Sequence, residues 1–167
     1  VNHSTYKCTA FLNGINIGVG TITINNSLEG GNSYSLIINN GSQVFKYNEQ
    51  GVSPADNASI NPIEILPLGF TLYDNTGEEI PHTAIKGEDI RWIIPREDTM
   101  LKVLSAYGEP TFETETTYIY TNTYDMGFSI SPTYYSRKLN NTIILEVSYK
   151  DNLFIAKTDL TFLKEGE

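Results

Sequence analysis

Two groups of acidic residues have the chemical types that catalysis or metal binding uses. Glu113 and Glu115 are separated by one residue, and paired carboxylates hydrolyse glycosidic bonds when a cleft holds them on the two sides of the sugar. Alternation along an extended chain sends both of these side chains to the same side. We therefore expect the pair to face solvent rather than to act as an acid and a base.

The run Asp-Asn-Thr-Gly-Glu-Glu at 74–79 is the second group, and its oxygen atoms are of the kind that Ca²⁺ prefers. It lies between two segments with strand signal, and its Asp, Asn and Gly are turn-forming residues. We interpret it as a hairpin turn, with weak calcium binding as the alternative. His3 and His82 are far apart and belong to no Cys/His cluster, so the sequence predicts no metal site.

Nucleophilic catalysis has equally little support. Cys8 is the single cysteine, which excludes an intrachain disulfide, and no cluster of basic residues surrounds it, so we expect a small apolar strand residue there. The sequence has no Gly-x-Ser-x-Gly elbow and no glycine-rich phosphate loop with its lysine. We predict no catalytic residue and no cofactor, and hence a protein that is not an enzyme.

Tyrosine is the residue type with a surplus, at 11 copies against 1 Trp. The densest stretch is 117–135, and its candidate binding residues are Tyr118, Tyr120, Tyr124, Tyr134 and Tyr135. Tyr118 and Tyr120 share one face of a strand, so both face the core or both face outward. One interpretation is core and cross-strand packing. The other is an exposed aromatic surface for protein contacts or sugar stacking.

Two similar hairpins are predicted to frame the chain. Residues 4–12 and 15–24 alternate around Asn13-Gly14, a strong hairpin signal, and residues 141–149 and 153–162 form a closing hairpin. The segments 11–24 and 149–162 align without a gap. We predict that residues 1–28 are the closing hairpin of a preceding β-module, or strands that pair with a partner chain, plus a connector. Residues 29–167 are predicted to form one elaborated β-sandwich.

Between the hairpins, short apolar runs alternate with Asn, Ser, Thr, Gly and Pro. Strands are expected at 34–38, 43–47, 63–66, 70–73, 90–94, 100–104, 116–121 and 128–130, with a returning strand within 78–85. Helical periodicity is weak throughout. This pattern predicts an all-β, antiparallel sandwich of the immunoglobulin-like kind, with Trp92 as a candidate core residue of a central strand.

The net charge of −9 argues against two classes of partner. Nucleic-acid binding needs basic surface that displaces counterions from phosphates, and anionic membranes attract the same kind of surface. No apolar stretch approaches the roughly 20 residues that cross a bilayer. We therefore expect neither nucleic-acid binding nor membrane insertion.

Three segments resemble modules of phage tail, fibre and baseplate structural proteins. They are residues 33–38, residues 63–79 and residues 90–101. The resemblance implies a non-enzymatic virion component that contacts other virion proteins, often as a homo-oligomer. Two other interpretations stay open: a host-surface module that binds a carbohydrate or receptor, and a repeat of an adhesin on the bacterial cell surface.

Overall fold

Almost every apolar segment among the described residues forms a β-strand. The computed structural model describes residues 2–12, 15–26, 33–51, 65–130, 139–164 and 166, and the account below concerns these residues. They form no α-helix. Their strands are β1 (Asn2–Leu12), β2 (Ile15–Asn26), β3 (Ser33–Asn39), β4 (Val44–Tyr47), β5 (Ile65–Tyr73), β6 (Ile90–Pro95), β7 (Leu101–Val103), β8 (Phe112–Glu113), β9 (Thr117–Thr121), β10 (Met126–Ile130), β11 (Leu139–Tyr149) and β12 (Asn152–Lys164).

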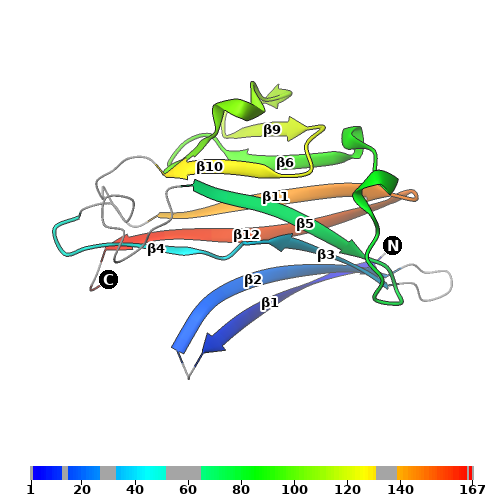
Figure 1. The fold of residues 1–167 in the computed structure, drawn as a ribbon, viewed down its shortest axis with the longest axis horizontal. Helices are drawn as coiled ribbons and strands as arrows, with labels where there is room; N and C mark the ends of the chain where they lie inside the picture. Colours follow the sequence, from blue (N-terminus) through cyan, green and yellow to red (C-terminus); the bar gives the residue numbers. More distant parts are fainter. Residues whose placement is uncertain are drawn as a thin grey trace.

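The strands are arranged in two six-stranded sheets (Figure 1). The first sheet has the order β1-β2-β3-β5-β10-β7, and the second has the order β4-β12-β11-β6-β9-β8. Neighbours are antiparallel except β4 and β12, which run parallel. The prediction of an all-β, two-sheet sandwich is therefore confirmed, and its pairing is mostly antiparallel.

Strand alternation builds the core between the sheets. On β12, Phe154, Ala156, Thr158, Leu160 and Phe162 are almost fully buried, while the residues that alternate with them are half-buried or exposed. The first sheet contributes a matching row from β3, β5, β10 and β7, namely Leu36, Ile38, Leu66, Leu68, Phe70, Leu72, Leu101, Met126 and Phe128. Each large side chain that leaves water stabilises the fold by roughly 1.5–3 kcal/mol.

Trp92 lies at the centre of the second sheet, as predicted. Its strand β6 is flanked by β11 and β9, and its side chain has no exposed surface. The indole Nε1–H donates a hydrogen bond to the carbonyl of Thr123 at 3.2 Å, so the polar group of this buried ring is satisfied.

The closing hairpin is also confirmed, and its turn is one residue shorter than the interval of 150–152 left between the two predicted strands. Tyr149 pairs with Asn152, so the two turn residues are Lys150 and Asp151, whose φ angles are 47° and 63°. Positive φ at both positions matches the twist of the strands. The N-terminal hairpin pairs Leu12 with Ile15 and contains a bulge between Ala10 and Phe11. Both hairpins are thus antiparallel, and the N-terminal one has a register shift where the closing one is continuous.

The N-terminal hairpin joins the first sheet through a short contact. Residues Thr23–Asn26 of β2 pair with Ser33–Leu36 of β3, and β2 also comes close to β12. Beyond this contact the ribbon of β1 and β2 bends away from the other strands (Figure 1). The connector at 27–32 lies outside the described residues, and the assignment of residues 1–28 to a separate module stays a prediction.

The predicted returning strand within 78–85 is wrong. This stretch contains one bridge, Tyr73 to Glu79, followed by two 3₁₀ turns, η2 (His82–Ala84) and η3 (Gly87–Asp89). Ile80 and Ile85 are buried, and their apolar character suggested a strand. Their spacing of five residues suits the turns of an irregular connection rather than the period of two that a strand requires.

Pro67 lies within β5 rather than between two strands. It is opposite Gly127 of β10, and on its other side β3 has already ended with the pair Asn39–Gly69. The Asn40 side chain donates to the Pro67 carbonyl at 3.2 Å on that open side. Because a proline nitrogen cannot donate a ladder hydrogen bond, β5 tolerates Pro67 where its neighbour is missing.

Candidate functional site

The candidate tyrosines on β9 occupy the core-facing side of that strand. Tyr120 is opposite Trp92 and is 7% exposed, whereas Tyr118 is opposite Ile94 and is half-buried. Burial raises the pKa of the Tyr120 hydroxyl, and the negative charge of Glu109 adds to the effect. Tyr120 is thus a core residue with a neutral hydroxyl, while the Tyr118 ring reaches the surface.

Tyr118 is covered on one face by Arg96. The guanidinium carbon lies 5.2 Å from the ring centroid, a geometry worth about 0.5–1 kcal/mol at an exposed site. The same Arg96 Nη1 donates to the Thr114 carbonyl at 3.0 Å and lies 3.4 Å from Glu113 Oε2. Glu113 therefore pairs with an arginine at the surface, in agreement with its predicted solvent-facing position.

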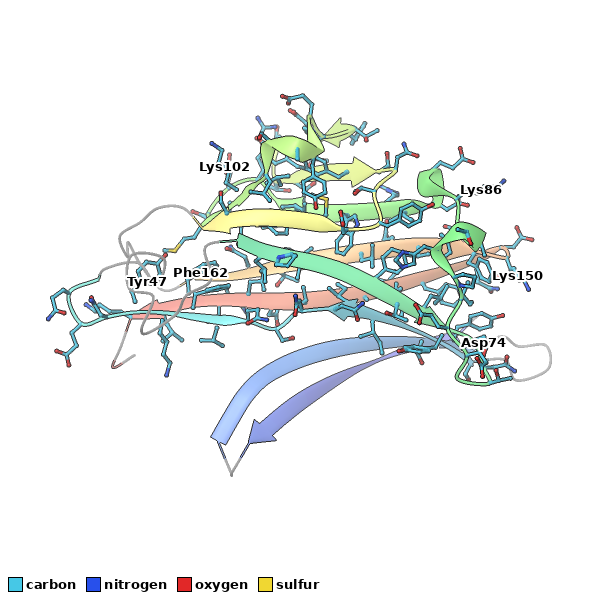
Figure 2. All side chains as sticks on the ribbon, in the orientation of Figure 1. Tyr47, Asp74, Lys86, Lys102, Lys150 and Phe162 are labelled. Carbon is cyan, nitrogen blue, oxygen red and sulfur yellow. The ribbon has the colours of Figure 1, made fainter. Side chains whose placement is uncertain are left out.

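Both tyrosines line an open cleft of about 380 Å³ between β6, β7, β9 and the loop at 105–110. Lys102, at the upper left in Figure 2, is among its lining residues. The side chains with polar or aromatic groups that line it are Arg96, Thr99, Lys102, Ser105, Glu109, Glu113, Tyr118 and Tyr120. This set offers ring stacking and two charges of each sign. Aromatic and charged groups of these types can stack on, hydrogen-bond and ion-pair with a polar ligand.

Tyr124 belongs to a different aromatic group. Its ring stacks on His82 at 5.2 Å between centroids, and His82 stacks in turn on Phe70 at 4.7 Å. The Tyr124 hydroxyl donates to the Ile85 carbonyl at 2.9 Å. Tyr124 therefore secures the irregular connection before β6. Tyr134 and Tyr135 lie outside the described residues.

The oxygen-rich run at 74–79 forms a turn. Asp74 Oδ1 accepts hydrogen bonds from the N–H of Thr76 at 2.8 Å, from the Thr76 hydroxyl at 2.6 Å and from the N–H of Glu78 at 3.0 Å. These bonds, the one from the Thr76 hydroxyl foremost, hold the pKa of the Asp74 carboxyl below its usual value. Asp74 lies far from Lys102 and its cleft (Figure 2).

In the described part of the chain, no three His, Cys, Asp or Glu residues gather in a way that would hold a metal ion. None of the helices described is long and apolar enough to span a membrane.

A second candidate site is the free edge of β1. The strand is paired with β2 on one side and has no partner strand among the described residues on the other. An unpaired edge presents a row of N–H and C=O groups that another strand can extend. Sequence reasoning overlooked one signal here: the first acidic residue of the chain is Glu29, so the whole hairpin is free of negative charge.

No family model, no curated protein and no solved structure matches this chain.

Proposed function

We propose that this protein is a non-enzymatic structural module of a virion, an immunoglobulin-like sandwich in a phage tail, baseplate or fibre that works through contacts with neighbouring subunits. The observation that carries the proposal is the long edge of β1, which no described strand covers, on a ribbon that bends away from the body of the fold (Figure 1). The buried Trp92 on a central strand of the second sheet supports the immunoglobulin-like assignment.

The geometry of the ribbon supports an assembly role. Only the last residues of β2, Thr23–Asn26, pair with β3, so Ile15–Ile22 have β1 as their one neighbour in the sheet among the described strands. A two-stranded ribbon is marginally stable in water and gains from a third strand. Addition of a strand from another chain at β1 would supply backbone hydrogen bonds along its length.

A second function is favoured by the cleft beside Tyr118. An aromatic ring next to Arg96, Lys102 and two glutamates is a surface that a sugar can stack on and hydrogen-bond. In that case the module binds a carbohydrate or receptor on a host surface. If the module is instead an adhesin repeat, it would bind the same kind of ligand from a bacterial cell surface.

Localisation tests the main proposal. A culture that produces the protein is fractionated on a density gradient, which separates virus particles from cell envelopes. Antibodies raised against the chain are then applied to the fractions. We expect the chain in the particle fraction, and at defined positions on tails or fibres by immunogold electron microscopy. Recovery in the envelope fraction alone would contradict the virion assignment and favour the adhesin.

A glycan array tests the second function. Wild type, Tyr118→Ala and Arg96→Ala are compared with Tyr124→Ala, whose ring lies outside the cleft. If the cleft binds a sugar, the first two substitutions remove a signal that Tyr124→Ala keeps. Absence of signal for wild type on a broad array would reject the carbohydrate proposal.

A further inference from the structure

The N-terminal hairpin carries none of the protein's negative charge. The chain has 20 Asp and Glu, the first of them Glu29, and Lys7 is the one Lys or Arg before that position. The ribbon of β1 and β2 is therefore weakly positive on a molecule whose net charge is −9. Two copies of an anionic protein repel each other where their acidic surfaces meet. The hairpin is the part of the chain where a second copy approaches without this repulsion.

The β1 edge also differs from the other three sheet ends. Within the described residues, the other end strands are short, with 3 residues in β7, 4 in β4 and 2 in β8. β1 has 11 residues, with no proline and no acidic residue. At about 3.3 Å per residue it offers an edge of roughly 36 Å. Short strands, charged residues and bulges protect an edge from pairing. β1 is long, its one charged residue is Lys7, and its register shift lies near its end, between Ala10 and Phe11, so residues 2–10 form a regular edge.

We infer that the partner of this edge is a second copy of the chain, with β1 pairing antiparallel to β1 of the copy about a two-fold axis. The inference rests on the proposed function, because it identifies the occupant of the proposed assembly edge. The pairing joins the two first sheets into one continuous sheet. It also projects the acidic bodies to opposite sides of the axis, where solvent ions screen them beyond about 10 Å.

The charge of Lys7 and the position of the bulge determine which residues of β1 are opposite each other in the dimer. A two-fold axis places one residue of β1 opposite its own copy. An axis at Lys7 sets two ammonium groups against each other, which destabilises a strand pair. An axis at Tyr6 puts Lys7 opposite Thr5 and pairs residues 2–10, which end at the bulge between Ala10 and Phe11. The inferred dimer therefore has Tyr6 at its axis and Cys8 opposite Ser4 of the copy.

Charge exchange at Tyr6 tests this arrangement by sedimentation velocity over a range of concentrations. Wild type is expected to reach twice the monomer mass. Tyr6→Glu and Tyr6→Lys each place like charges at the axis, and we expect self-association about tenfold weaker for each. An equimolar mixture of the two variants restores the dimer as a heterodimer. Lys102→Glu, at the opposite end of the same sheet, is the control that leaves the dimer unchanged.

Cross-linking tests the register. Ser4→Cys is expected to give a disulfide-linked dimer through Cys8 on mild oxidation, because opposed residues of antiparallel strands lie at disulfide distance. Thr5→Cys faces Lys7 in this register and is expected to cross-link poorly. A wild type that stays monomeric, or a mixture of charged variants that fails to associate, would overturn the inference.

The two proposals fail separately. A chain that is found in virus particles but does not dimerise through β1 keeps the proposed function and loses its inferred partner. A chain that dimerises through Tyr6 but is absent from particles keeps the interface and loses the virion role.

Discussion

The buried side chain of Asn141 on β11 donates a hydrogen bond from Nδ2 to the backbone carbonyl of Asp98, at 3.0 Å. Its Oδ1 accepts the Thr99 hydroxyl at 3.1 Å and the N–H of Met100 at 3.4 Å. One amide thus binds three successive residues, 98–100, of the connection between β6 and β7. This connection leads into the strand on which Lys102 lines the cleft, so Asn141 helps to position that wall.

Replacement of Asn141 is therefore expected to destabilise the fold. Asn141→Leu leaves the Asp98 carbonyl and the Met100 N–H without their side-chain partner, at a cost of about 2 kcal/mol in the free energy of unfolding. Urea denaturation followed by tryptophan fluorescence measures it. Asn140→Ala, next along the strand but exposed, is the matched control and should cost under about 0.5 kcal/mol. Equal losses for the two variants would contradict this role.

Gly41 is required by the close approach of a neighbouring strand. A Cβ on Gly41 would overlap Thr158 Oγ1 and lie 2.9 Å from the Thr158 Cβ, and Oγ1 is held by the N–H of Ser42 at 2.6 Å. Since Thr158 is buried and β-branched, it has little room to move. We expect Gly41→Ala to cost about 1–3 kcal/mol by thermal or urea unfolding.

Two variants check that this cost comes from contact with Thr158. Thr158→Ala should lower the free energy of unfolding less in the Gly41→Ala background than in wild type, because it removes the hydroxyl that the new Cβ would overlap. Gly69→Ala is the matched control, since a Cβ there would meet nothing nearer than Asn39 Nδ2 at 4.0 Å. Strict additivity of the Gly41 and Thr158 effects would argue against the steric explanation.

Much of this fold follows from local sequence, and the reasons are local. The alternation of residues 153–162 specifies both β12 and the side that packs inward, because a strand has a period of two. Trp92 in an apolar run before Pro95 similarly marks a central strand. The parallel pairing of β4 with β12 joins segments far apart in the chain, and no short pattern encodes it.

The candidate sites were less predictable for the same reason. The cleft unites Arg96 with Lys102 and the β9 tyrosines through folding of separate segments. Asn141 looked like one polar residue among many in an Asn-rich stretch, and only its position opposite the 98–100 loop makes it structural. The sequence shows that no acidic residue precedes Glu29. It does not show that β1 lies at the end of a sheet, and this position is what makes the missing charge relevant to assembly.

Alkaline pH is expected to destabilise the protein through Tyr47. Burial raises the pKa of this hydroxyl from 10.0 to about 12, and the hydroxyl donates to Met100 Sδ at 3.3 Å. The unfolded chain releases the proton near pH 10 while the folded chain keeps it, so the stabilisation is complete below pH 10 and is lost as the pH rises toward 12. Urea unfolding between these values should show a steep fall in stability. Tyr47→Phe should make the fall shallower, and an unchanged slope would contradict the assignment.

Acid is expected to weaken the turn at Asp74. Hydrogen bonds from Thr76 and Glu78 favour the ionised carboxyl and lower its pKa, so their stabilisation is present above the unfolded-state value and is lost as the pH falls through the folded-state value. Asp74→Ala should lower the melting temperature at neutral pH. At pH 2.5 the difference in melting temperature between wild type and this variant should be smaller. Glu79→Ala in the same turn region is the control. A constant difference at all pH values would show that charge on Asp74 is irrelevant to the turn.

Amide hydrogen-exchange rates should differ between the two hairpins and report directly on the proposed assembly edge. β11 is paired on both sides, with β12 along its length and with β6 at Ile144–Val147, so these amides exchange only when the sandwich opens. Among the described strands, β1 is paired with β2 alone, and every second N–H along it points to the open side. In dilute solution we expect alternate β1 amides to exchange rapidly while those of β11 stay protected. As the concentration rises, strand pairing at β1 should protect the outward amides within residues 2–10, and Tyr6→Glu should abolish that protection without affecting β11. Protection of every β1 amide in the monomer would mean that its edge is already covered within the chain, and the edge would then be unable to serve as an assembly surface.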